Sequence, residues 1–89
     1  MLTRQELGLT TEQAETPIHV NGEMWTLLDA ARYLHDAHRS DNPDQLVVFI
    51  LGTELTRLRQ EAKTVGDSEL IGAADALEKS AREIWAGDT

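Results

Sequence analysis

Two histidines and two aspartates that are close in the sequence are the residues best suited to bind a metal ion. His35 and His38 are three residues apart, so on a helix they share a face, with Asp36 and Asp41 nearby. The two histidines supply only half of a zinc coordination shell, while Asp36 lies about 100° around the helix from His35. Both histidines also lie near a helix end, where the dipole favours a cation. We therefore expect no metal site.

A serine beside acidic residues, in the run 66–70, is the nearest match to a catalytic nucleophile. An enzyme of this kind needs a nucleophile paired with a base, or two opposed carboxylates, held in a cleft. The run is also typical of a turn followed by a helix cap, and the six glycines are scattered rather than gathered in a phosphate-binding loop. We expect no enzymatic activity and no cofactor.

The composition indicates a single acidic domain. The chain has 89 residues, of which 40% are apolar, enough for one hydrophobic core. Its 16 acids and 8 bases give a net charge of −8, which opposes sequence-independent binding to nucleic acid or to an anionic membrane. The longest apolar run, residues 46–51, is far shorter than the roughly 20 residues of a membrane-spanning helix. The shortness of this run predicts a soluble protein. A small secreted domain usually needs disulfides, and because this chain has no cysteine, we expect it in the reducing cytoplasm.

The N-terminal residues carry the weakest structural signals. Residues 1–16 are polar, and Thr10 or Thr11 is suited to cap a short helical turn that ends at Glu15. We expect this segment to be loosely ordered and residues 17–89 to form the single helical domain.

A short β-hairpin is predicted over residues 18–25. Asn21 and Gly22 suit a type I′ turn, which needs a positive φ at both central residues. A hairpin of this size is marginal alone, so we expect it to pack against helices.

The first long helix is predicted over residues 26–39. Thr26 and Asp29 have the spacing of a capping box, in which the threonine side chain and the third helical residue bond each other's backbone N–H groups. The apolar residues that follow recur at helical spacing and form one broad face.

The second helix is predicted over residues 43–65, with Asn42 as the N-cap and Pro43 at the first helical position. The apolar, β-branched run 46–51 also fits a buried strand, but the cap and the continuous apolar spacing favour a helix. Gly66 is a suitable C-terminal stop. The expected core-facing residues recur at steps of three and four: Val48, Leu51, Leu55, Leu58, Ala62 and Val65.

The third helix, over residues 68–86, has the same apolar spacing and would pair with the second as an antiparallel helical hairpin. The predicted fold is therefore all-α, a three-helix domain with a possible N-terminal β-hairpin. Leu46, Phe49 and Ile50 project away from the hairpin contact, and we expect the 26–39 helix to cover them. A homodimer is the alternative cover. The apolar residues of the third helix that we expect to face the second are Leu70, Ala74, Leu77, Ala81 and Ile84.

Residues 26–34, with a polar cap, a paired alanine and a leucine, resemble the opening helix of excisionase-type helix-turn-helix proteins. That resemblance implies a small DNA-binding regulator, which is the alternative function. A recognition helix should present basic and polar side chains. Here the next helix opens with six apolar residues, and Arg57, Arg59 and Lys63 are scattered around it.

The favoured function is a non-enzymatic protein-binding module: an adaptor, a chaperone or an inhibitor, including an acidic inhibitor that imitates nucleic acid. The last helix holds the densest acid, which would steer a basic protein partner, while a tryptophan would anchor it. Trp85 is the expected anchor, although it also fits a core position at the end of the hairpin. The expected partner-binding residues are Glu69, Asp75, Glu78, Glu83 and Trp85, with Trp25 and Tyr33 as a second surface.

Overall fold

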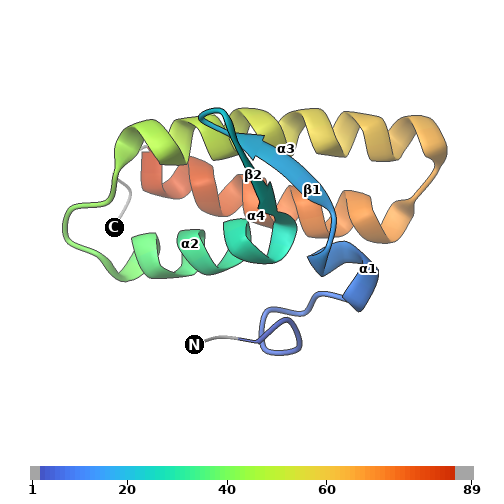
Figure 1. Ribbon diagram of the computed structural model, residues 1–89, viewed down its shortest axis with the longest axis horizontal. Helices are drawn as coiled ribbons and strands as arrows, with labels where there is room; N and C mark the ends of the chain where they lie inside the picture. The colour runs from blue at the N-terminus through green and yellow to red at the C-terminus, as the bar shows by residue number, and fades with distance from the viewer. Residues whose placement is uncertain (1–2, 86–89) are drawn as a thin grey trace.

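The computed structural model describes residues 3–85 of the chain, and over these residues the protein is mostly helical (Figure 1). The two-stranded antiparallel sheet makes the predicted all-α class too narrow, although the hairpin itself was expected. The last residue of the predicted 68–86 helix, Ala86, lies outside the described range. In chain order the elements are α1 (Thr11–Ala14), β1 (Pro17–Val20), β2 (Glu23–Thr26), α2 (Leu27–Arg39), α3 (Gln45–Val65) and α4 (Ser68–Trp85).

The N-terminal residues contribute to the core. Thr10 caps α1, and its side chain and that of Gln13 form the reciprocal bonds of a capping box. Leu9 and Ala14 are both buried, and α1 packs against α2. The segment that was expected to be loosely ordered therefore supplies two core side chains.

The β-hairpin forms with the predicted turn. Asn21 and Gly22 have φ values of 52° and 83°, as a type I′ turn requires. In the antiparallel register Ile18 lies opposite Trp25, and Ile18 and Val20 are fully buried. Because alternate strand residues point to the same side, β1 buries this apolar side and packs against α3.

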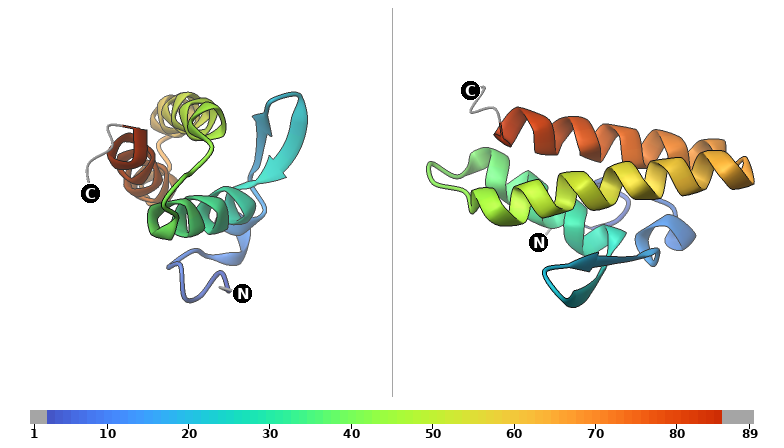
Figure 2. Two further views of the ribbon diagram at one scale, coloured as in Figure 1. Left: turned by 90° about the vertical axis from the view of Figure 1, so that its left-hand side faces the viewer. Right: turned by 90° about the horizontal axis from the view of Figure 1, so that it is seen from above.

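Helix α2 begins at the predicted capping box, in which Thr26 and Asp29 bond each other's backbone N–H groups. Seen end-on, α2, α3 and α4 form a triangle, and the hairpin lies beside α3 and α2 (Figure 2). Helix α2 packs against α4 and β2, and β1 covers part of α3 instead. The prediction that α2 would cover Leu46 and Phe49 is therefore wrong, since they are 61% and 53% exposed.

The predicted antiparallel pairing of α3 and α4 is confirmed, and it is the largest contact between elements of the described chain. The N-cap of α3 is Asp44 rather than Asn42, because the Asp44 carboxylate accepts the first free N–H groups. Gly66, with φ 76°, ends α3 as expected, and Asp67 accepts the Leu70 N–H at the start of α4.

The spacing of apolar residues correctly predicted most of the buried residues between α3 and α4. All but one of the residues expected to face α4 are buried, and the exception is Val65, which is 77% exposed in the last turn of α3. The predicted α4 residues Ala74, Ala81 and Ile84 are buried, whereas Leu70 and Leu77 are half-buried. Within residues 3–85, no helix has the length and hydrophobicity needed to cross a bilayer.

Leu55 tests this core, because its side chain is fully buried in the middle of α3. We expect Leu55→Ala to lower the free energy of unfolding by roughly 2–5 kcal/mol, the usual cost of lost apolar contact plus a cavity. The exposed Val65→Ala change on the same helix is the matched control, with an expected loss below about 0.5 kcal/mol. Urea denaturation followed by circular dichroism measures both, and equal losses would contradict this packing.

Candidate functional site

The aromatic side chains form two separate pairs. Phe49 of α3 and Trp85 of α4 have ring centroids 5.1 Å apart at an interplanar angle of 47°. Trp25 of β2 and Tyr33 of α2 make an edge-to-face contact at 5.7 Å. Phe49 and Trp85 are each 53% exposed, which makes their pair the larger aromatic surface open to solvent.

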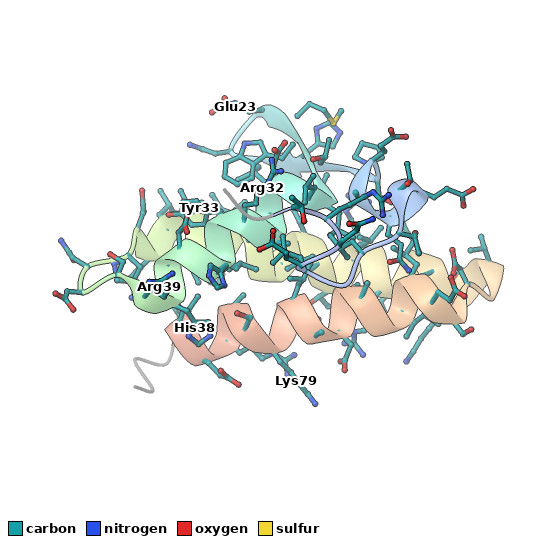
Figure 3. All side chains as sticks on the ribbon, turned by 90° about the horizontal axis from the view of Figure 1, so that it is seen from below. Glu23, Arg32, Tyr33, His38, Arg39 and Lys79 are labelled. Atoms are coloured by element: carbon teal, nitrogen blue, oxygen red, sulfur yellow. The ribbon has the colours of Figure 1, made fainter. Side chains whose placement is uncertain are left out.

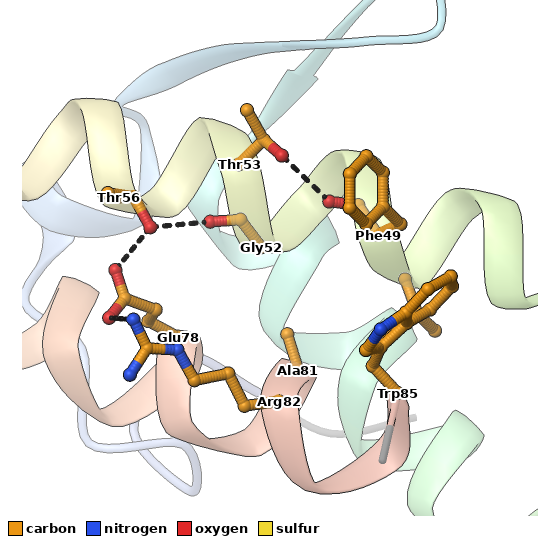
Figure 4. Close-up of a pocket in the computed structure, with 9 residues that line it drawn as sticks. Phe49, Gly52, Thr53, Thr56, Glu78, Ala81, Arg82 and Trp85 are labelled. Carbon is orange, nitrogen blue, oxygen red and sulfur yellow. Dashed lines mark hydrogen bonds and ion pairs between the residues drawn. The ribbon is translucent and has the colours of Figure 1, made fainter. Parts of the chain in front are cut away.

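A groove of about 200 Å³ lies between α3 and α4 beside the Phe49–Trp85 pair (Figure 4). We call it the aromatic groove. It owes its depth to small residues, because a Cβ built on Gly52 would lie 3.7 Å from the Ala81 Cβ. The apolar end is lined by Val48, Phe49, Gly52, Ala81 and Trp85, and the polar end by Thr56, Glu78 and Arg82.

The polar end of the groove is built around the Glu78 carboxylate. Thr56 donates a hydrogen bond to Glu78 Oε2 over 2.5 Å, and that oxygen lies 3.4 Å from Arg59 Nη2. The other oxygen, Oε1, lies 3.1 Å from Arg82 Nη2. Two guanidinium groups and a hydroxyl therefore compensate one buried negative charge, which is the condition under which a buried ion is tolerated.

The prediction that Glu78 lies on the solvent face of the last helix is wrong, since the residue is only 3% exposed. Its position in the helix explains why. Glu78 follows Ala74 by four residues and precedes Ala81 by three, so it lies within about 60° of both core alanines. The four-residue spacing of Glu78 and Arg82 was interpreted as an ion pair on the surface. The position of Glu78 between the buried apolar residues of the same helix face was the better indication of its burial.

Among the other acids proposed as partner-binding residues, Glu83 lies on the opposite side of α4 from Trp85. Glu69 and Glu83 are exposed, but Glu83 precedes Trp85 by two residues and so projects about 160° away from it. Asp75 is half-buried. His38, at the end of α2, lies 3.4 Å from Glu83 across the α2–α4 contact (Figure 3). The role of Glu69, Asp75 and Glu83 in steering a partner stays a prediction.

The Trp25–Tyr33 pair forms a second, shallower surface next to Met24, which is 62% exposed. Glu23 projects near this surface (Figure 3). Burial, and next the negative charge of Asp44, raise the pKa of the Tyr33 hydroxyl above its ordinary value. Both rings of this pair are half-buried, so less of their area is open to a partner.

In the part of the chain that the structure describes, the two histidines belong to no cluster of potential metal ligands. His35 is half-buried and His38 is exposed, and within residues 3–85 no three His, Cys, Asp or Glu side chains meet in a group able to hold a metal ion. Ser68 is the first residue of α4, beside the helix cap that Asp67 provides.

Comparison with known proteins finds no relative of this chain. No family model, no curated protein and no solved structure matches this chain. The candidate site therefore rests on its own geometry.

Glu78 gives a direct test of the polar end of the groove. Glu78→Ala removes the partner of two arginines, and we expect it to lower the free energy of unfolding by roughly 2–4 kcal/mol. Glu83→Ala is the matched control, because Glu83 is exposed on the same helix and a surface ion pair contributes about 1 kcal/mol or less. Thermal and urea unfolding measure both, and a Glu78→Ala protein as stable as Glu83→Ala would rule out the network.

Proposed function

We propose that this protein is a non-enzymatic protein-binding module that docks another polypeptide chain on the aromatic groove. The observation that carries the proposal is the gathering of Leu46, Phe49 and Trp85, each more than half exposed, at the end where α3 begins and α4 ends. A contiguous apolar patch with a polar rim is typical of a protein-interaction site. Aromatic residues at its centre are typical of the residues that carry binding energy.

The groove has the form that accepts an apolar side chain from a partner. Its floor is the close contact between Gly52 and Ala81, and Phe49 and Trp85 form one wall. Arg82, whose side chain is 70% exposed, stands at the polar end and offers N–H donors to a partner's acidic or carbonyl groups. An adaptor, a chaperone and an inhibitor would all use such a surface.

The negative charge supports a general role in solubility and steering rather than imitation of nucleic acid. Imitation requires an array of free carboxylates, and two arginines compensate Glu78 while Glu83 lies beside His38. The remaining exposed acids keep the chain soluble and attract basic partners. We therefore do not propose the nucleic-acid-mimicking form of the inhibitor.

No observation favours the DNA-binding alternative. The helix that would read DNA exposes Leu46 and Phe49 in its first turns. Arg57 is paired with Glu54 and Glu61, and its side-chain hydrogen bond to Glu54 raises its pKa further. Arg59 is directed to Glu78 instead. Phosphate contacts need lysines and arginines that are available to the backbone.

The proposal predicts that polypeptides retained by the tagged chain depend on Leu46. In a capture from lysate of cells that express the chain, Leu46→Asp should lose whatever the unchanged chain retains, copies of the chain included, because a charge is placed at an apolar contact. Val65→Asp is the matched control, since Val65 is 77% exposed on the same helix but at its other end. Mass spectrometry identifies the retained chains.

Circular dichroism must show that both variants keep the helical content of the unchanged chain. If Leu46→Asp and Val65→Asp retain the same polypeptides as the unchanged chain, the aromatic groove is not the docking surface and the proposal fails.

A further inference from the structure

The outward side of α3 is uncharged over four turns. Leu46, Phe49, Thr53, Thr56 and Gln60 follow one another at steps of three and four, and we call them the outer stripe. An arc of about 100° around this stripe holds no charged side chain between residues 45 and 60. On a chain with net charge −8, this is where a second, equally negative chain meets the least repulsion.

The hydroxyl groups of the outer stripe are bonded within the chain. Thr53 donates to the Phe49 carbonyl over 3.1 Å, and Thr56 donates to the buried Glu78 carboxylate. Covering these threonines therefore leaves no hydroxyl donor unpaired, and their methyl groups are presented to a partner. Another helix can therefore cover the part of the stripe from Leu46 to Thr56 without leaving a threonine hydroxyl unpaired.

We propose that the occupant of the aromatic groove is a second copy of this chain, with the two α3 helices antiparallel about a two-fold axis at Phe49. This inference rests on the proposed function and names the partner of the same site. A two-fold contact uses the same surface on both copies, so each protruding side chain must fit a hollow on the same surface of the other copy. Leu46, one turn before Phe49, is the protruding side chain, and Gly52, one turn after it, is at the floor of the groove.

The antiparallel arrangement brings matching residues together along the stripe. Positions equally distant from Phe49 face each other, so Leu46 meets Gly52 of the second copy and Gln45 meets Thr53. None of these residues is charged. Asp44, which by the same rule lies opposite Glu54 of the second copy, is directed to the Leu46 and Val47 N–H groups as the N-cap of α3.

Engineered cysteines test this arrangement, because the natural chain has none. Phe49→Cys places a thiol at the axis, so oxidation should give a disulfide-linked dimer. Val65→Cys, equally able to react on an exposed surface of α3, should form little disulfide-linked dimer under the same conditions. Gln45→Cys combined with Thr53→Cys keeps Phe49 and should also link two copies, since the two positions within one helix are about 12 Å apart and cannot bond each other.

Sedimentation equilibrium of the unchanged chain provides the second readout. We expect a species of twice the 9.9 kDa chain mass, and Leu46→Asp should raise its dissociation constant at least about tenfold, whereas Val65→Asp should not. A monomer at all concentrations overturns the inference, as does a dimer that resists Leu46→Asp and shows no cysteine linkage. If the chain is monomeric but the capture of another protein still depends on Leu46, the inference fails and the proposed function stands. If neither depends on Leu46, both fail.

Discussion

The close antiparallel contact between α3 and α4 holds the rest of the molecule in place. It joins the two longest helices through their buried apolar residues, and Gly52 of α3 faces Ala81 of α4 within it. Helix α2 then packs on α4 and strand β1 packs on α3, so the third helix and the hairpin both depend on this pair. Glu78 lies inside the same contact and bonds Thr56 and Arg59 of α3. A buried carboxylate that needs particular partners penalises any register of the two helices that would leave it unpaired.

The same contact creates the candidate site. The residues that line the aromatic groove belong to α3 and α4, and the small size of Gly52 and Ala81 leaves room for it between them. Phe49 and Trp85 contact each other at its edge and still expose about half of their area. The outer stripe carries no charged residue, and the charge beside the groove is confined to its polar end, at Glu78 and Arg82. This distribution of charge is the basis for assigning contact with another polypeptide to the aromatic groove and the outer stripe.

The sequence predicted the local structure well, because caps and turns depend on a few neighbouring residues. The Thr26–Asp29 capping box, the Asn21–Gly22 turn and the Gly66 stop all formed as expected. The apolar spacing also identified the α3–α4 pairing. The covering of α3 was harder to predict, because the order in which elements pack is a property of the whole chain. The hairpin took the place that was assigned to α2, and Phe49 and Leu46 remained exposed.

The candidate site was only partly predictable for a related reason. Trp85 was singled out by its residue type, but its contact with Phe49 joins residues 36 positions apart, which no local pattern encodes. Glu78 was assigned to the surface because acids are rarely buried without partners, and its partners on α3 could be identified only once the helices were placed. The groove lies where Gly52, which has no side chain, faces the small side chain of Ala81, a pairing that is visible only in three dimensions.

Whether the aromatic groove binds a second copy of the chain is tested by the accessibility of Trp85 to a quencher as the chain concentration rises. Trp25→Phe leaves Trp85 as the only tryptophan, and acrylamide is a suitable quencher because it is neutral and unaffected by the net charge of −8. If a second copy occupies the aromatic groove, we expect ready quenching of Trp85 fluorescence in dilute solution and progressive protection at high concentration, with protection abolished by Leu46→Asp. Quenching that is equally strong at every concentration, or a Trp85 that is already shielded in the most dilute sample, would contradict this inference.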